Sequence, residues 1–250
     1  MQMTETIREL TDRRSVRAFL DTPLTEEEKT AILLASCNAP TAGNQQLYSI
    51  LDITDQGIKD RLAVLCDNQP FIADAPLVLI FAADQQRWYD AYLLENADPR
   101  RPEEGDLLLA VTDACIAAQN AVTAAHSLGI GSCYIGDIME NCEAVRELLC
   151  LPPYVFPCAM LVFGRPKPFV PGSRKPPRFD LKDIVFNNRY MQKTGDELRS
   201  AMAVKNSGMK PYADWVRAFC KRKYDSAFSR EMSRSVREYL APFSDRSDQL

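Results

Sequence analysis

Hydrophobic and polar residues follow one another along this chain in patterns typical of a fold that mixes helices and strands. Continuous apolar runs at residues 76–82 and 158–163 predict strands that are covered on both faces. Residues 47–53 alternate apolar and polar side chains, which predicts a strand with one buried face. A short fourth strand, followed by a turn, is predicted within residues 131–136.

Helices are predicted between these strands and after them. Thr25 begins one with a capping box, because Glu28 follows three residues later, and Pro40 forces its end. The longest helical pattern covers residues 104–128, is rich in Ala and Leu, and stops at Gly129. The other predicted helices are residues 4–12, 57–66, 141–149 (with Asn141 as N-cap), 211–222 and 226–240.

The order of these elements predicts a single α+β domain over residues 1–250. The chain has no internal repeat and no long flexible linker, and we interpret the proline-rich residues 164–180 as a surface excursion. Residues 200–250 are expected to form a helical C-terminal extension of this domain.

Composition and charge exclude some functions. Of 250 residues, 46% are hydrophobic and 26% are charged, so the chain can bury a large core. Lys and Arg number 30 against 34 Asp and Glu, which gives a net charge of −4. Such a field does not hold a long polyanion, so broad nucleic-acid binding is disfavoured, while a local cluster for a small phosphate is compatible with it.

One histidine and eight cysteines narrow the chemistry further. Because His126 is alone, one chain cannot build a His-rich zinc or iron site, and we predict no metal. No cysteine pair has the C-x-x-C spacing. The N-terminus lacks an apolar signal region and no run of 18 apolar residues occurs, so we expect a cytoplasmic protein with free thiols.

Two basic segments are candidates for binding a phosphate. Arg13-Arg14-Ser15-x-Arg17 puts three guanidinium groups and a hydroxyl within five residues, and guanidinium forks match phosphate oxygens. In an extended stretch Arg13, Ser15 and Arg17 point to one side and Arg14 to the other. A second basic loop runs from Arg174 to Arg178. Taken alone, each segment is more often a solvated, charged loop than a phosphate site.

Two further loops have residue types suited to a planar ligand. Residues 39–46, Ala-Pro-Thr-Ala-Gly-Asn-Gln-Gln, place a hydroxyl, three amides and a glycine together, and amides offer donors and acceptors to a heterocycle. Residues 129–136 contain glycines that allow a ligand to approach the backbone closely. Their order is G-x-G-x-x-x-x-G after a helix, which excludes a Rossmann dinucleotide site. Taken singly, both are also ordinary turns.

Taken together and in this order, with Asn68-Gln69-Pro70-Phe71-Ile72-Ala73-Asp74-Ala75-Pro76 between them, these segments resemble the nitroreductase superfamily of FMN-dependent NAD(P)H oxidoreductases. The resemblance covers nearly the whole chain and is closer to the oxygen-insensitive nitroreductase and flavin reductase branch. It implies a three-layer α-β-α sandwich with a central, mostly antiparallel sheet. It also implies a homodimer with FMN at the subunit interface and NAD(P)H as electron donor.

The resemblance also implies a set of cofactor-binding residues. These are Arg13, Arg14, Ser15 and Arg17 at the phosphate; Pro40, Thr41, Ala42, Asn44 and Gln46 in a loop that usually reaches flavin across the dimer; Gln69 at the polar edge of the flavin; Tyr134, Ile135, Gly136 and Asp137 beside its reactive face; and Lys175 and Arg178 in a late basic pair. Asp137 departs from the family pattern, because many relatives have a small residue there.

The activity that this resemblance implies is hydride transfer through flavin N5, so no side chain is assigned as catalytic. The acceptor would be a nitroaromatic, a quinone or a flavin, reduced in a ping-pong cycle. Two alternatives stay open on the sequence alone: a specialised family member, such as a dehalogenase or a flavin-fragmenting enzyme, and a non-enzymatic flavin carrier.

Overall fold

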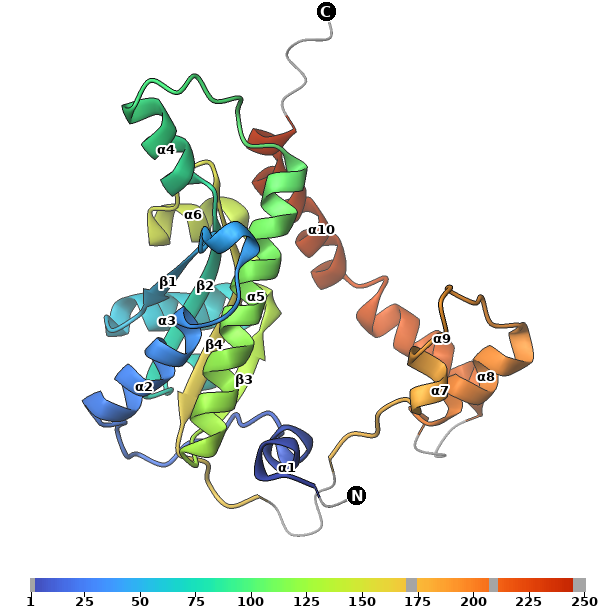
Figure 1. Cartoon of the computed structure of the whole chain (residues 1–250). Helices are drawn as coiled ribbons and strands as arrows, with labels where there is room; N and C mark the ends of the chain where they lie inside the picture. Colours follow the sequence, from blue (N-terminus) through green and yellow to red (C-terminus); the bar gives the residue numbers. More distant parts are fainter. Residues whose placement is uncertain (1–2, 170–174, 207–210, 245–250) are drawn as a thin grey trace, which may run out of the picture. The chain divides into compact units, whose positions relative to one another are not determined.

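A four-stranded antiparallel sheet forms the centre of the protein (Figure 1). In the computed structural model, which describes residues 3–169, 175–206 and 211–244, the strands are β1 (Tyr48–Asp52), β2 (Leu77–Asp84), β3 (Gly131–Ile135) and β4 (Val155–Gly164). Their order in the sheet is β1-β2-β4-β3. All three neighbouring pairs are antiparallel, and a register shift interrupts the β2–β4 pairing between Phe81 and Ala82.

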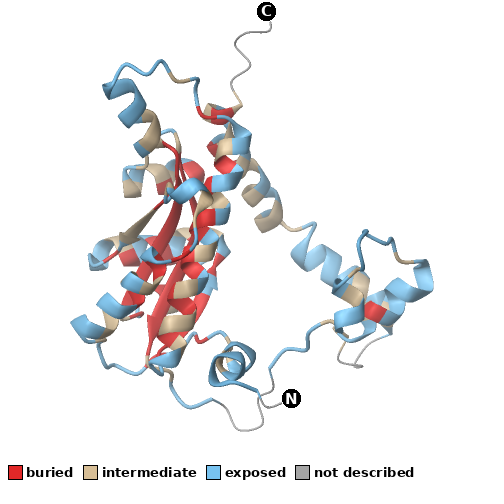
Figure 2. Cartoon of the chain, in the orientation of Figure 1, coloured by how far each residue is buried: buried red, intermediate tan, exposed pale blue. Residues whose placement is uncertain are grey.

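Helices cover both faces of this sheet. The long α5 (Glu104–Ser127) and α2 (Glu26–Cys37) pack on the face that carries Leu79 and Phe81. α3 (Gln56–Leu65) and α6 (Cys142–Leu149) contribute to a second core, on the face that carries Val78 and Ile80. Strands β2 and β4 are therefore buried along their whole length (Figure 2), as their apolar runs predict. The predicted three-layer α-β-α arrangement is confirmed.

Helix α5 is the centre of the first core. Its small side chains at Ala114, Ala117, Ala118 and Ala121 are fully buried and allow α2 and the sheet to approach closely. Among the described helices, α5 is the one that is long and apolar enough to cross a membrane by length and composition alone. In this structure one side of it packs on the sheet, as a core helix does.

The N-terminal segment connects the basic motif to the sheet. α1 (Glu5–Asp12) begins at Thr4, whose hydroxyl caps it, and the chain then runs extended past Arg13. Ser15 forms a parallel bridge with Ser132, and the Val16 N–H donates to the Ser132 carbonyl at 2.9 Å. A Cβ atom at Gly131 would lie 2.5 Å from Val16 Cγ2, so only glycine permits this approach.

The remaining predictions of secondary structure are mostly confirmed, with three helices missed. The capping box of Thr25 and Glu28 is present at the start of α2. Sequence analysis missed α4 (Gln86–Leu94), α7 (Leu181–Ile184) and α8 (Gly195–Ala203). These helices have few or no buried residues, so no apolar stripe reveals them; the capping box of Thr194 and Glu197 was the available signal for α8.

The described chain forms two compact units. The first contains residues 3–169 and 231–244, and the second contains the described part of residues 175–230. The second unit holds α7, α8 and α9 (Tyr212–Lys223), and α10 (Ala227–Leu240) begins in it and continues into the first. Within the second unit large apolar side chains stay exposed, including Tyr190 at 81% and Tyr224 at 82% (Figure 2).

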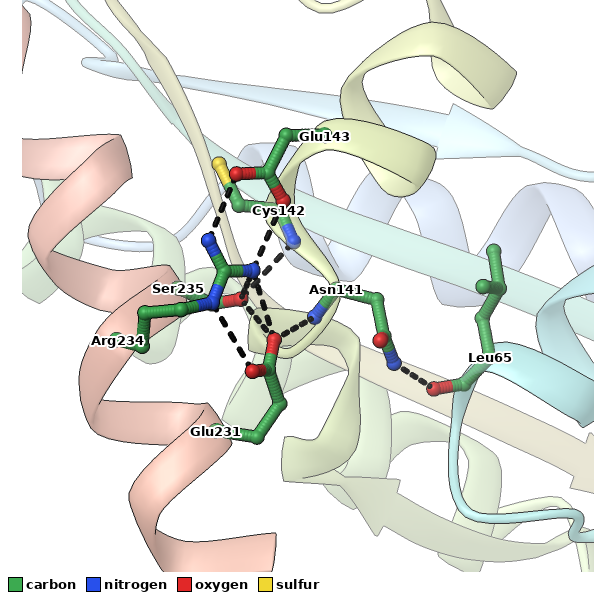
Figure 3. A network of polar contacts seen from close by, with 7 residues as sticks. All are labelled: Leu65, Asn141, Cys142, Glu143, Glu231, Arg234 and Ser235. Atoms are coloured by element: carbon green, nitrogen blue, oxygen red, sulfur yellow. Dashed lines mark hydrogen bonds and ion pairs between the residues drawn. The ribbon is translucent and has the colours of Figure 1, made fainter.

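The C-terminal part of α10 supplies the N-cap of α6 (Figure 3). The Ser235 hydroxyl accepts from the Cys142 N–H at 3.0 Å, and Glu231 Oε1 accepts from the Asn141 N–H at 3.3 Å. Arg234 joins Glu231 to Glu143 by ion pairs. Asn141 is the N-cap residue of α6, as predicted, but its side chain makes no capping hydrogen bond: the residue has a φ of 50°, and its amide donates instead to the Leu65 carbonyl.

Candidate functional site

The basic motif lies against the edge strand β3. Arg13, Ser15 and Arg17 all lie near the Cys133 thiol and act to lower its pKa, although burial raises it more. The Arg14 guanidinium lies on the ring of Phe169, 3.1 Å from its centroid. Arg14 therefore holds the chain in place, while its neighbours form the basic surface.

The Arg13 guanidinium has a nitrogen that could bind an anion. Arg13 Nη1 is buried, and it has no hydrogen-bond partner among the residues that the structure describes. A buried donor without a partner is costly, and a phosphate oxygen would satisfy it. A cavity of about 360 Å³ beside Arg13 is lined also by Asp12, Arg14 and Phe169, among other residues, but not by Ser15 or Arg17. Arg13 therefore fits the phosphate group of a flavin nucleotide, and the parts of Ser15 and Arg17 stay a prediction.

The end of β3 and the turn that follows it at Gly136–Met139, called here the glycine turn, contain the next candidate residues. In β3, Tyr134 is partly exposed and its hydroxyl donates to Gln119 Oε1 at 3.4 Å, whereas Ile135 is buried in the second core. Gly136 is exposed, and a Cβ atom built on it would meet nothing within 4 Å. Packing within the chain thus does not require glycine here, and the open space beside Gly136 is what a ligand approaching the backbone would use.

Gln69 lies beside this turn and is bound to Asp137. The Gln69 Nε2 amide donates to Asp137 Oδ2 at 2.9 Å and to the Cys66 carbonyl at 2.8 Å. Next to Asp137 is Glu140, which is only 6% exposed and was not singled out by sequence analysis. Burial, followed by repulsion from Asp137 and other carboxylates, raises the pKa of Glu140 to about 7.

The loop at residues 40–46 is held at a different place. Asp113 of α5, 2% exposed, accepts from the Ala42 N–H at 2.9 Å and from the Leu47 N–H at 3.2 Å. Gln46 Nε2 donates to the Cys37 carbonyl, and the Trp88 indole donates to the Gln45 carbonyl. Sequence analysis missed Asp113, although one acidic residue inside an Ala-rich apolar helix is a readable signal.

Loop residues Pro40, Thr41, Ala42 and Asn44 are exposed or half-buried around this anchor, and Gly43, Asn44 and Gln46 adopt positive φ values. Among the described residues, no hydrogen bond joins the loop to the basic motif, to Gln69 or to the glycine turn. The structure thus brings the motif, Gln69 and the turn together around β3, and it holds the 40–46 loop separately.

Lys175 and Arg178 lie in the second unit, where both are exposed. Their part in the site stays a prediction. Arg174, the first residue of the same basic loop, lies outside the described residues.

The neighbouring thiols do not form a redox centre. Burial raises the pKa of Cys133 despite the nearby arginines, and it also raises the pKa of Cys66. All eight cysteines are free. Within the described ranges, no group of three or more His, Cys, Asp or Glu residues is arranged to hold a metal ion.

Comparison with known proteins places this architecture in a family. The model of the Nitroreductase family matches residues 10–165, which include the basic motif, the 40–46 loop, Gln69 and the glycine turn. FMN reductase (NAD(P)H) of Bacillus subtilis (strain 168) is 32% identical over 241 residues, which are 95% of this chain and 91% of that protein. The oxygen-insensitive NADPH nitroreductase of Salmonella typhimurium is 36% identical over 188 residues, which are 75% of each protein.

A solved structure agrees with these sequence relatives. The NADPH:FMN oxidoreductase from Vibrio harveyi, complexed with NAD+, superimposes with a TM-score of 0.78 at 25% identity, over 95% of this chain and 98% of that one. The family predicted from the order of the sequence motifs is therefore confirmed: this chain belongs to the nitroreductase family.

Proposed function

We propose that this protein is an FMN-dependent NAD(P)H oxidoreductase that reduces nitroaromatic, quinone or flavin-type acceptors. The observation that carries the proposal is Arg13 Nη1, a buried donor without a partner among the described residues, in a basic motif that is bridged to β3, the strand directly before the turn at Gly136. The family relatives named as FMN reductase and NADPH nitroreductase support the same activity. They do not favour a non-enzymatic flavin carrier.

The residues around β3 would hold the cofactor. Arg13, Ser15 and Arg17 would bind its phosphate with charge-assisted hydrogen bonds, and Gln69 would contact the polar edge of the ring. The open backbone at Gly136, next to Ile135, leaves room for the ring to lie close. When bound, FMN supplies the hydride exchange between nicotinamide and acceptor; the protein binds it, orients it and sets its electrostatic surroundings.

The active form is proposed to be a homodimer in which the 40–46 loop of one protomer completes the site of the other. Asp113 of α5 holds this loop, and among the described residues no hydrogen bond joins the loop to the chain's own basic motif, which supports such sharing. The solvent side of α5 offers an apolar surface, with Leu108 66% exposed and a shallow cavity at Val111, Cys115 and Ile116. We propose that the second unit, with Lys175 and Arg178, also lies against the partner. Both units are proposed to belong to one functional domain. The protein is proposed to work in the cytoplasm.

The experiment that tests the function begins with the colour of the purified protein. We expect a yellow protein with about one FMN per chain, whose 450 nm band is bleached anaerobically by NADPH or NADH. Steady-state rates over both substrates are then expected to give parallel double-reciprocal lines, because one stacking site cannot hold donor and acceptor together. A colourless protein that takes up no added FMN would refute the proposal. Intersecting double-reciprocal lines would show that donor and acceptor do not use the same stacking site in turn.

A further inference from the structure

The contact between Gln69 and Asp137 determines which end of the Gln69 amide is available. An amide nitrogen carries two hydrogens, and in Gln69 both are used: one on the Asp137 carboxylate and one on the Cys66 carbonyl. Both partners are oxygen acceptors. Reversing the amide would place its oxygen against them and lose two hydrogen bonds, so the orientation shown is the stable one.

The Gln69 carbonyl is consequently the free end. Within the described part of the chain, no donor pairs with Gln69 Oε1, and the residue is half-buried beside the turn at Gly136. The backbone around it is also fixed, because the Gln69 N–H donates to the Ala63 carbonyl at 2.9 Å. Gln69 therefore offers the site a hydrogen-bond acceptor and no donor.

A second carboxyl group lies close to Asp137. Glu140 is buried, and Asp137 is among the neighbours that raise the pKa of Glu140 to about 7. The hydrogen bond that Asp137 accepts in this structure comes from the Gln69 amide.

We propose that Asp137 is a positioning residue, which turns the Gln69 amide so that its carbonyl accepts from the N3–H group of bound FMN. The oxidised isoalloxazine ring has one N–H group, at N3, flanked by two carbonyl oxygens, so an acceptor has only this group to pair with. The inference rests on the proposed function. It goes beyond it by giving a role to the Asp137 carboxylate, which contacts Gln69.

The test compares FMN with N3-methyl-FMN, which cannot donate, by titrating apoprotein and following flavin fluorescence. Wild type is expected to bind the methylated flavin about tenfold or more weakly than FMN. Gln69→Ala removes the acceptor and is expected to bring the ratio of the two dissociation constants close to one. Asp137→Ala is expected to lower the ratio toward that of Gln69→Ala, since the amide is then free to turn.

The conservative variant Asp137→Asn separates orientation from charge. Its side-chain oxygen still accepts from Gln69, so the ratio is expected to stay near that of wild type. The midpoint potential of the bound flavin should rise, because a negative charge near the ring disfavours the reduced anion.

Asp137→Leu, of similar size and without an acceptor, replaces Asp137→Ala in the test if the alanine variant folds poorly. The matched control is Asp52→Ala on β1, which removes a carboxylate that pairs with Lys29 of α2.

The outcomes separate the two proposals. If wild type binds no FMN, the proposed function fails. If wild type binds FMN and discriminates against the methylated flavin, but Asp137→Ala and Asp137→Leu discriminate equally well, then Asp137 does not position Gln69 and the inference is overturned.

Discussion

Asp113 Oδ1 accepts a hydrogen bond from the Ala42 N–H at 2.9 Å, across 71 positions of the sequence. The second carboxylate oxygen accepts from the Leu47 N–H, so one buried side chain holds both ends of a loop. Within that loop, Gly43, Asn44 and Gln46 have positive φ values, a conformation that needs support from outside. Asp113 therefore connects the core helix α5 to the loop that we propose to reach the flavin.

Asp113→Ala is expected to loosen this loop and to weaken FMN binding. Two backbone N–H groups lose their acceptor, which should destabilise the protein by roughly 2–4 kcal/mol. Asp113→Asn, which keeps one acceptor oxygen, should lose less. Thermal unfolding and FMN titration measure both effects, with exposed Asp90→Ala of α4 as the control. Unchanged flavin affinity in a folded Asp113→Ala protein would show that the loop is not part of the site.

Arg17→Glu is expected to weaken FMN binding at least tenfold, because a charged hydrogen bond to phosphate is worth roughly 1.5–3 kcal/mol and the reversal adds repulsion. The matched control is Arg61→Glu on α3, an exposed position with the same change of charge. Glu28 is unsuitable as a control site, because it caps α2 and pairs with Arg165. Equal affinities for the two arginine variants would contradict a phosphate site at the motif.

The fold was predictable from sequence where burial imposes a pattern. The apolar runs of β2 and β4, the capping box at Thr25 and the long α5 all carry local signals of this kind. α4 is partly exposed and lacks such a signal, so sequence analysis missed it. The same limit explains why the capping hydrogen bonds of α6 were not predicted, because the side chains that accept from its first N–H groups belong to α10, about ninety residues away.

Some features of the candidate site were also predictable from sequence, and others were not. The extended course of the chain at the basic motif was predictable, and the bridge from Ser15 to Ser132 of β3 agrees with it, whereas the contact of Arg14 with Phe169 was not predictable. The partners of the loop and of Gln69 did not follow from sequence. Asp113 and Asp137 act through contacts of 71 and 68 positions' separation, which only the folded chain brings together.

Ser235→Ala is expected to lower stability by about 1–2 kcal/mol, as the loss of a helix N-cap does. Ser235 is fully buried, and without its hydroxyl the Cys142 N–H at the start of α6 has no acceptor there. Chemical denaturation of wild type and variant measures the difference. Ser200→Ala, at an exposed position of α8, is the control, and a Ser235→Ala protein as stable as that control would argue against capping by α10.

Glu140 should make stability depend on pH. Because the folded-state pKa is raised to about 7, the folded protein holds the proton more tightly than the unfolded chain does. Stability is therefore greatest below the usual carboxyl range and falls as the pH rises from about 4.5 to 7, by on the order of 1–3 kcal/mol. The neighbours Asp137, Asp67 and Glu231 all act in this direction.

Glu140→Gln mimics the protonated form and is expected to remove this fall. Melting temperatures of wild type and variant should agree near pH 5 and differ near pH 8, where the variant is the more stable. Glu147→Gln, an exposed position on α6, should follow wild type at both values. If Glu140→Gln lowers the melting temperature equally at pH 5 and pH 8, the pKa of Glu140 is not raised in the folded protein.

The solvent side of α5 is the surface that we expect a second copy of the chain to cover. Leu108 and Leu109 are 66% and 52% exposed, and Val111, Cys115 and Ile116 line a shallow apolar cavity along the same helix. The same helix holds the 40–46 loop through Asp113, and Leu109 lines a further cavity together with Gln45 of that loop. A partner bound to this face would therefore lie close to the loop that we propose to share with it.

Leu108→Arg is expected to yield a monomer that has lost FMN. The side chain is mostly exposed in the single chain, so the change should not disturb the fold, whereas a charge buried in an apolar interface is strongly unfavourable. Leu94→Arg on α4, at a side chain that is 78% exposed, makes the same change elsewhere and should leave the dimer intact. Light scattering gives the mass, and the absorbance of the same peak gives the flavin content. Because the 40–46 loop would complete the partner's site, mass and flavin should fall together; a monomer that retains FMN would refute the shared site.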